Sequence, residues 1–192
     1  MTAQIITFNE EEMLPACLAA LTWVDEIVVV DSHSRDRTRE IARARGAKVF
    51  EHDFTDFASQ FNWAMEQATG DWIFVVDADE VVDAQLSQAI RDTLAGEPAY
   101  EVYQVVRDAF FLGHRMRATS WSGEALPRLF RRGCLSYRGQ VHSVADSGGR
   151  PVGRLPGRIL HYTYRDMGQY FRKFDLYTTH WARDAFAQGR RV

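Results

Sequence analysis

The first half of the chain alternates between short apolar runs and amphipathic segments. The second apolar run is apolar at every position, which predicts a strand covered on both faces. Between the runs, apolar residues recur at helical spacing. Regular alternation of strand and helix predicts a parallel α/β sheet. The expected strands are residues 4–8, 27–30, 48–51 and 72–76.

Capping residues and helix breakers mark the helix ends, and the pattern changes in the second half. Asn9 and Glu12 stand three residues apart before an apolar stripe, which predicts a capping pair for the first helix. Another helix is expected after Asp83, and glycine and proline at 96–98 end it. Short strand-like pieces then predict a smaller, mixed second half. They lie at residues 100–106, 126–132 and 141–145.

A final helix is expected at about residues 167–187, with large apolar residues on one face. We expect this face to pack on the protein's own core. The alternative, in which it lies on a membrane surface beside Arg172 and Lys173, stays open. The face consists of Met167, Tyr170, Phe171, Phe174 and Trp181.

The composition is that of a folded protein. The chain has 192 residues, 46% of them hydrophobic, which suits one domain and argues against disorder. It has no apolar run near the roughly 18 residues of a membrane span and no cationic leader with a cleavage site. Cys17 and Cys134 form neither a metal motif nor a disulfide framework. We therefore expect a soluble protein of the cytoplasm.

Charge is sorted along the chain, although the net charge is only −3. Residues 1–106 hold 7 Lys and Arg against 20 Asp and Glu, whereas residues 107–173 hold 13 against 4. An acidic half could hold a metal and a basic half an anionic substrate. Ordinary surface charge remains the alternative.

Polar clusters follow three of the expected strands. They begin at Thr7, at Asp31 and at Asp77, and the last reads Asp77-Ala78-Asp79. Ligands of open parallel sheets bind at the carboxyl ends of strands, so these clusters are expected to converge. If the second and fourth strands flank the first, Asp31 and Asp77 lie roughly 10 Å apart, the scale of a nucleoside.

Within this arrangement, Asp31 could accept from a pyrimidine N–H and Asp77 could meet the ribose hydroxyls. Asp79 points the same way as Asp77 and could hold Mg²⁺ or Mn²⁺ with phosphate oxygens. A metal bridging a diphosphate would then neutralise the carboxylate cluster. Alternatively, each aspartate is a helix cap or a turn former. The absence of a Gly-rich phosphate loop argues against dinucleotide-binding and P-loop proteins.

Five stretches of the chain carry a resemblance to a known family. The stretches are ITFNEE, WVDEIVVVDSHSRDRTREIARARGAKV, FASQFNWAMEQATGDWIFVVDADE, RLFRRG and LHYTYRDMGQYFRKFDLYT. They closely resemble the family 2 glycosyltransferases of GT-A fold, nearest to the lipopolysaccharide-core β-glucosyltransferases. The resemblance implies an α/β GT-A fold, a Rossmann-like and mostly parallel sheet flanked by helices, with a smaller mixed second half and a C-terminal helix.

The resemblance also implies a nucleotide-sugar donor, most often UDP-linked, a metal ion and inversion at the anomeric carbon. It implies nucleotide-sugar binding by residues 1–106 and acceptor binding by residues 107–192 of the same domain. Relatives usually continue for several dozen residues, so the chain is expected to be truncated or unusually short. By position, Thr7, Asn9 and Glu10 would lie along the nucleoside, Asp31 at the base, Asn62 near the donor, Asp77 at the ribose and Asp79 at the metal.

The catalytic base is expected where relatives carry W-Y-P-D. This chain reads Trp121-Ser122-Gly123-Glu124, so Glu124 stands at the Asp position and is the candidate. Its extra methylene shifts the carboxylate, and errors of about 1 Å can cost about 10²-fold in rate. A second departure is Val141-His142-Ser143, where relatives often read V-H-E; the absent glutamate favours Glu124.

Two further residues stand in family stretches. His161 could be a metal ligand or could donate to the diphosphate, and a purely structural role stays open. Arg128 could grip the diphosphate or a phosphorylated acceptor, because the guanidinium fork suits phosphate.

The sequence thus predicts an inverting, Mn²⁺- or Mg²⁺-dependent transfer of a hexose from a UDP-sugar. The acceptor would be a bacterial cell-envelope glycan, in the lipopolysaccharide core or related, or a lipid-linked acceptor, reached at the cytoplasmic face of the inner membrane. No nucleic-acid partner is expected. The alternatives are a sugar nucleotidyltransferase and a nucleotide-sugar-binding protein of the same fold without turnover.

Overall fold

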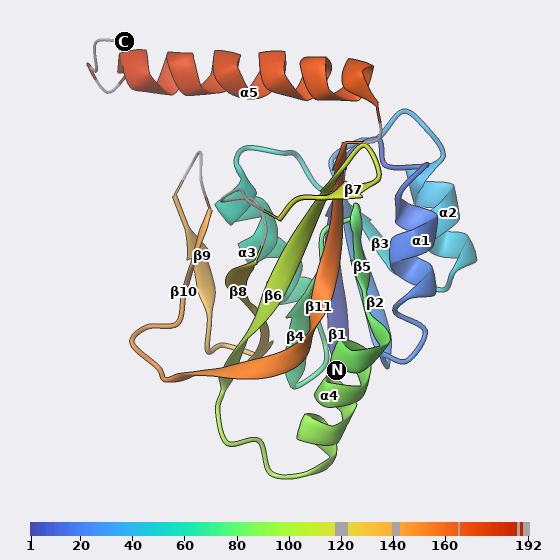
Figure 1. The fold of residues 1–192 in the computed structure, drawn as a ribbon, viewed down its shortest axis with the longest axis vertical. Helices are drawn as coiled ribbons and strands as arrows, with labels where there is room; N and C mark the ends of the chain where they lie inside the picture. The colour runs from blue at the N-terminus through green and yellow to red at the C-terminus, as the bar shows by residue number, and fades with distance from the viewer. Residues whose placement is uncertain (118–122, 140–142, 165, 188, 190–192) are drawn as a thin grey trace.

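The computed structural model describes residues 1–117, 123–139, 143–164, 166–187 and 189. It is an α/β structure with helices on the faces of a twisted sheet (Figure 1). The helices are α1 Leu14–Ala19, α2 Thr38–Ala44, α3 Phe57–Gln67, α4 Ala84–Ala95 and α5 Met167–Ala187. The strands are β1 Thr2–Thr7, β2 Glu26–Asp31, β3 Lys48–Glu51, β4 Trp72–Val75, β5 Glu80–Val82, β6 Val102–Phe111, β7 His114–Arg115, β8 Glu124–Arg131, β9 Ser136–Arg138, β10 Val144–Asp146 and β11 Val152–Tyr164.

One large sheet joins the two halves of the chain. Its order among the described strands is β3-β2-β1-β4-β8-β6-β11-β5, with β7 paired to β6. Strands β1 to β4 are mutually parallel, as predicted. Strands β2 and β4 flank β1, which is the condition for Asp31 and Asp77 to lie near each other. Strand β8 runs antiparallel between β4 and β6, and β11 is parallel to β6. The expected mixed α/β architecture is therefore confirmed.

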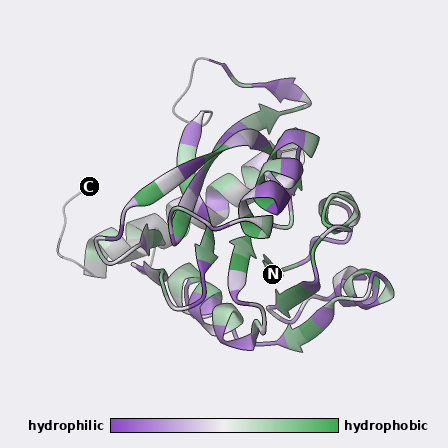
Figure 2. Cartoon of the chain, turned by 90° about the horizontal axis from the view of Figure 1, so that it is seen from below, coloured by the Kyte–Doolittle hydropathy of each residue, from purple (hydrophilic) through white to green (hydrophobic). Residues whose placement is uncertain are grey.

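Strand β2 is covered on both faces, as its uniform apolar run predicts. Val28 and Val30 pack with Ala64 of α3, whereas Val29 belongs to the core cluster that includes Leu14 and Ala42 on the opposite face. All three valines are fully buried. Figure 2 shows apolar colouring concentrated on the strands between the helices. Burial of each such side chain contributes about 1.5–3 kcal/mol.

The expected capping pair at the first helix is wrong. Helix α1 begins after Met13 and has no side-chain capping hydrogen bond. Asn9 instead has a positive φ of 56°, and its side-chain oxygen accepts from Arg35 N–H at 2.8 Å. The asparagine therefore joins the loop after β1 to the turn after β2 rather than starting the helix.

Four of the described strands were not predicted: β5, β7, β9 and β11. Strand β5 follows the carboxylate cluster, and β11 runs through 13 residues past two glycines and a proline. Gly157 has φ +89°, and a Cβ there would lie 2.3 Å from the backbone nitrogen of Leu86. Only glycine permits this approach of β11 to α4. Val141 and His142, part of another expected strand, lie outside the described residues; β10 starts at Val144.

The last helix does not pack its apolar face on the core. Figure 1 shows α5 lying across the end of the sheet rather than along one of its faces. Met167, Phe171 and Phe174 are 44%, 60% and 51% exposed, so the expected docking is wrong for these three. Tyr170 is the contact point, because its ring meets Phe111 edge-on. The side chains of Arg172, Lys173 and Trp181 lie outside what the structure describes.

Candidate active site

The carboxylates after β4 meet a histidine from β11. Asp77 and Asp79 lie in the turn between β4 and β5, and Glu80 is the first residue of β5. The antiparallel pairing of β5 with β11 sets His161 opposite Glu80. His161 Nε2 consequently lies 3.4 Å from Asp79 Oδ2. Tyr162 N–H fixes the same turn by donating to Asp79 O at 2.9 Å.

An arginine neutralises the cluster from inside the protein. Arg128 of β8 donates through Nη2 to Asp77 Oδ2 at 3.0 Å and to Glu80 Oε1 at 2.7 Å. Its side chain is 6% exposed and that of Glu80 is fully buried. The sequence predicts that a metal supplies the positive charge missing from this cluster, and in the structure Arg128 supplies one positive charge. A role of Arg128 at phosphate stays a prediction.

This pairing makes the two carboxyl groups unequal. Burial acts to raise the pKa of Asp77, but the Arg128 charge outweighs it, so this pKa lies below its usual value. Burial raises the pKa of Glu80 to about 7, which Arg128 only partly offsets. Because like charges in a dry site cannot both ionise cheaply, Glu80 takes up the proton first. Asp77 therefore stays a carboxylate at neutral pH.

His161 and Asp79 form the second pair of the cluster. Burial acts to lower the pKa of His161, but its hydrogen bond to Asp79 and the charge of Asp79 outweigh this, so the pKa is raised. Both side chains are largely buried, at 17% and 13% exposure. Among the described residues, no group of three potential ligands converges as a complete metal cage. Asp79 and His161 fit the sparse ligand set of a divalent cation that keeps phosphate oxygens as its other ligands.

Asp31 lies at the end of β2, beside Thr7 at the end of β1. Thr7 Oγ1 donates to Asp31 Oδ2 at 2.9 Å, and Ser34 N–H donates to Oδ1 at 2.8 Å. Asp31 is fully buried and Thr7 is 4% exposed. In this structure the aspartate orders the turn after β2. Its contact with a nucleotide base stays a prediction.

The loop after β1 is tied to that same turn. Ser34 Oγ accepts from Asn9 N–H at 2.8 Å, and Thr38 Oγ1 accepts from Glu10 N–H at 2.8 Å. Asp36 accepts from Thr38 N–H at 3.0 Å at the start of α2. These bonds align the two strand ends that the sequence predicts to flank a nucleoside.

Asn62 lies on α3 and binds the backbone of β9. Its amide donates to Tyr137 O at 2.9 Å and accepts from Tyr137 N–H at 2.8 Å. Tyr137 is 8% exposed, and burial raises the pKa of its hydroxyl. The observed role of Asn62 is to join α3 to β9, and its proximity to a donor stays a prediction.

Glu124 begins β8, on the acceptor-side half of the chain. Its Oε2 lies 2.9 Å from Arg107 Nη2, and Arg107 Nη1 lies 3.9 Å from Glu80 Oε1. Acidic and basic side chains therefore alternate from Asp77 to Glu124 through Arg128, Glu80 and Arg107. Trp121 and Ser122 lie outside the described residues.

Sequence reasoning missed Glu80 and Arg107. Glu80 stands three residues after Asp77, and its place in the carboxylate run after an apolar strand was the available signal. Arg107 carried no signal in the sequence, because only the pairing of β6 with β8 sets it opposite Glu124.

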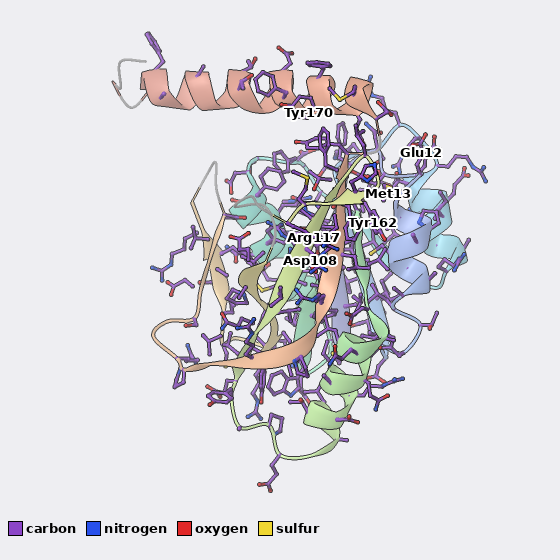
Figure 3. The ribbon with its side chains drawn as sticks, viewed as in Figure 1. Glu12, Met13, Asp108, Arg117, Tyr162 and Tyr170 are labelled. Atoms are coloured by element: carbon purple, nitrogen blue, oxygen red, sulfur yellow. The ribbon has the colours of Figure 1, made fainter. Side chains whose placement is uncertain are left out.

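The carboxyl ends of β1, β6 and β11 point toward the end of the sheet over which α5 lies (Figure 1). Figure 3 shows Met13 of the loop after β1, Tyr162 of β11 and Tyr170 of α5 at this end. The half-buried Tyr162 stacks on Phe110 of β6, with ring centroids 5.0 Å apart. Elements from both halves of the chain thus border the candidate site.

A Rossmann-like half with acidic groups at the carboxyl ends of its strands is the class of architecture that the family comparison identifies. The chain belongs to glycosyl transferase family 2, whose model matches residues 2–152. The resemblance seen in the sequence is thereby confirmed. The range matched by the family model runs from β1 to the start of β11. It therefore includes Asp79 and Glu124 but not His161.

Curated relatives extend this similarity. The lipopolysaccharide core biosynthesis glycosyltransferase LpsC of Rhizobium meliloti is 28% identical over 198 residues, which cover 100% of this chain and 73% of LpsC. A TPR repeat-containing protein of Synechococcus elongatus is 37% identical over 145 residues, covering 74% of this chain but 34% of the relative.

Solved glycosyltransferases share the fold. The structure of Staphylococcus aureus TarS 1–349 with UDP-GlcNAc has a TM-score of 0.63 at 17% identity, covering 86% of this chain and 59% of that one. The mannosyltransferase PcManGT of Pyrobaculum calidifontis, with GDP-Man and Mn²⁺, has a TM-score of 0.62 at 20% identity, covering 85% and 57%. The chain has the GT-A glycosyltransferase fold and spans less than two thirds of these structures.

Proposed function

We propose that the protein is an inverting glycosyltransferase that moves a hexose from a UDP-sugar to a cell-envelope acceptor, with Mn²⁺ or Mg²⁺. The observation that carries the proposal is the cluster after β4. There, Asp79 and His161 form an ion-pair contact of 3.4 Å beside Asp77, which Arg128 keeps ionised. Ionised oxygen ligands beside a histidine suit a hard divalent cation that also binds a diphosphate.

The donor half would be residues 1–106. Thr7, Asn9 and Glu10 would border the nucleoside, with Asp31 at the base and Asp77 at the ribose. Asn62 would lie near the donor. Support for a nucleotide sugar comes from the fold shared with TarS, solved with UDP-GlcNAc, and with PcManGT, solved with GDP-Man.

The metal would be held by Asp79, with His161 and Asp77 beside it. When bound, it would supply Lewis-acid stabilisation of the negative charge that develops on the leaving diphosphate. Arg128 would orient the Asp77 carboxylate, because its Nη2 bridges Asp77 and Glu80. Tyr162 N–H would hold the turn that carries Asp79.

On the acceptor side, residues 107–192, Glu124 would act as the general base. It would take the proton of the acceptor hydroxyl while the hydroxyl oxygen bonds to the anomeric carbon. The bond from that carbon to the diphosphate oxygen breaks at the same time, and its electron pair leaves with UDP. Attack opposite the leaving group inverts the anomeric configuration.

The acceptor would be a lipopolysaccharide-core or related glycan, free or lipid-linked, as the similarity to LpsC supports. The enzyme would work in the cytoplasm at the face of the inner membrane, with α5 touching the lipid surface. The exposed Met167, Phe171 and Phe174 support this contact. No described helix is both long and apolar enough to cross a membrane.

Titration calorimetry of UDP with and without Mn²⁺ tests the proposal. We expect UDP to bind at least about 10-fold more tightly with Mn²⁺, and Asp79→Ala to abolish that gain. Equal UDP affinity in the two conditions, or sugar transfer unchanged in Asp79→Ala, would refute it. Pyrophosphate release from UTP and a sugar phosphate would point instead to nucleotidyl transfer.

The replacement of the family's aspartate by Glu124 favours a second candidate, binding without turnover. In that case the protein binds UDP-glucose but neither hydrolyses it nor transfers glucose to any acceptor of a panel. Glu124→Asp would then create activity, because the shorter side chain restores the base to its family position.

A further inference from the structure

We infer that Arg107 is a positioning residue that holds the Glu124 carboxylate at a fixed place relative to the donor-side cluster. The inference rests on the proposed function, in which Glu124 takes the acceptor proton. Two nitrogens of the Arg107 guanidinium group face carboxylates, one of Glu124 and the other of Glu80.

The backbone brings Arg107 and Glu124 together. They are direct partners in the antiparallel pairing of β6 with β8, and Gly123 N–H donates to Arg107 O at 2.8 Å. Cross-strand partners lie on the same face of the sheet, so their side chains are neighbours. The position of the start of β8 is therefore set by β6 at this residue.

The side chain of Arg107 lies between an exposed carboxylate and a buried one. Its Nη2 is 2.9 Å from Glu124 Oε2, and the Glu124 side chain is 46% exposed. Its Nη1 is 3.9 Å from Glu80 Oε1, a charge contact rather than a hydrogen bond, and Glu80 is fully buried. Glu80 is itself fixed, because Oε1 accepts from Arg128 and Oε2 accepts from Asp77 N–H.

Through Arg107, the fixed position of Glu80 restrains the position of the Glu124 carboxylate. An exposed glutamate samples several rotamers, and a single exposed ion pair would restrain it only weakly. Arg107, however, is 22% exposed and has a buried partner at its other arm, so its own rotamer is restricted. Glu124 then has one oxygen held by Arg107, and its Oε1 has no partner among the described residues. That oxygen is the one available to the acceptor hydroxyl.

A further observation favours a functional role over a structural one. Arg107 Nε is buried and has no hydrogen-bond acceptor among the residues that the structure describes. An unsatisfied buried donor is unfavourable for folding. Stability alone does not explain a buried Nε–H donor without an acceptor. Such unfavourable features are commonly found at functional sites.

The test is a double-mutant cycle with Arg107→Met, Glu124→Gln and both together. UDP release from UDP-glucose is measured with Mn²⁺ and a lipopolysaccharide-core acceptor preparation, and UDP binding is measured by calorimetry. We expect Arg107→Met to lower kcat by about 10- to 100-fold, because small errors in position are costly. UDP affinity should change by less than about 2-fold, since the ion-pair contacts of Arg107 are with Glu80 and Glu124, neither of which is proposed to bind the donor.

The double variant should have the same kcat as Glu124→Gln within about 2-fold, because Arg107 acts through Glu124. Arg107→Lys should retain part of the activity, since lysine keeps the charge but not the fork. Arg154→Met, an exposed arginine on the neighbouring strand β11, is the matched control and should behave as wild type. A crystal structure of Arg107→Met should show the Glu124 carboxylate displaced.

Three results would overturn the inference. They are multiplicative losses in the double variant, a loss of UDP binding without a loss of kcat, and an unmoved Glu124 in the crystal structure of Arg107→Met. Wild-type protein that binds UDP with Mn²⁺ but never releases UDP from UDP-glucose would overturn it as well. Wild-type protein that does not bind UDP with Mn²⁺ instead refutes the proposed function, so the two failures can be told apart.

Discussion

Arg128 Nη2 lies 2.7 Å from Glu80 Oε1 inside the protein, where the Arg128 side chain is 6% exposed and that of Glu80 is fully buried. The same nitrogen bonds Asp77. An arginine from the second half of the chain thus neutralises an acidic turn from the first half. This ion pair links the stability of the fold to the geometry of the candidate site.

Arg128→Met should destabilise the protein strongly. It leaves the fully buried Glu80 and the 28% exposed Asp77 without their hydrogen-bonded counter-charge, and breaking a buried pair typically costs about 3–5 kcal/mol. Urea unfolding of both proteins at neutral pH measures the change. Arg154→Met removes an exposed arginine and should shift stability by less than about 0.5 kcal/mol. Similar stability of the two variants would mean that the pair contributes little.

Gly157→Ala should be among the most harmful glycine replacements. The residue has φ +89°, and the new Cβ would meet the Leu86 backbone at 2.3 Å, so both strain and a clash with α4 oppose it. We expect a loss of about 3–5 kcal/mol. Gly46→Ala is the control, because Gly46 has φ +79° but no atom within 4 Å of the added Cβ. It should cost about 1 kcal/mol, and equal losses would remove the clash from the explanation.

Glu26 should make stability depend on acid pH. Burial acts to raise its pKa, but hydrogen bonds from Lys48, Thr2 and Thr69 outweigh this and lower the pKa to about 2, from 4.5. Because the folded pKa is depressed, the contribution is complete above about pH 4.5 and is lost as the pH falls toward 2. Its size is about 1–3 kcal/mol, since the Glu26 side chain is only 10% exposed.

Glu26→Gln should therefore be less stable than wild type at pH 7 and equally stable near pH 2. Chemical denaturation at a series of pH values gives both curves. Glu66→Gln removes an exposed carboxylate of α3 and serves as the control. A constant difference between wild type and Glu26→Gln from pH 7 to 2 would contradict the prediction.

Asn62→Ala separates the observed role of this residue from the predicted one. It removes two hydrogen bonds to the Tyr137 backbone and leaves a buried N–H and C=O unpaired, so we expect a loss of about 2–3 kcal/mol. If Asn62 also borders the donor, UDP affinity with Mn²⁺ falls in the same variant. Weaker stability with unchanged UDP affinity would confine Asn62 to joining α3 and β9.

Much of the fold could be predicted from local pattern. The apolar run through Val28 and Val30 predicted a strand covered on both faces, and both residues are fully buried between helices. The alternation of strands and helices also predicted the parallel pairing of β1 to β4. These features depend on short-range periodicity and on the rules of parallel sheets, which sequence reasoning can apply directly.

Local pattern failed where distant residues decided the structure. Asn9 looked like a helix cap, but Arg35 N–H binds its side chain. The strand through Gly157 was missed, because two glycines and a proline interrupt it and only its packing against α4 explains the glycine. The apolar stripe of α5 looked like a core face, yet Phe171 is 60% exposed. Hydrophobic periodicity reveals a face but not what covers it.

The sequence by itself determined the family, the parallel sheet and the acidic turn at Asp77 and Asp79. Only the tertiary structure decided what surrounds that turn. Antiparallel pairing of β5 with β11 sets His161 beside Asp79, and the position of β8 in the sheet brings Arg128 to Glu80. These partners are separated by 48 residues or more along the chain. Strand pairing over such distances depends on the whole sheet, so no local pattern encodes it.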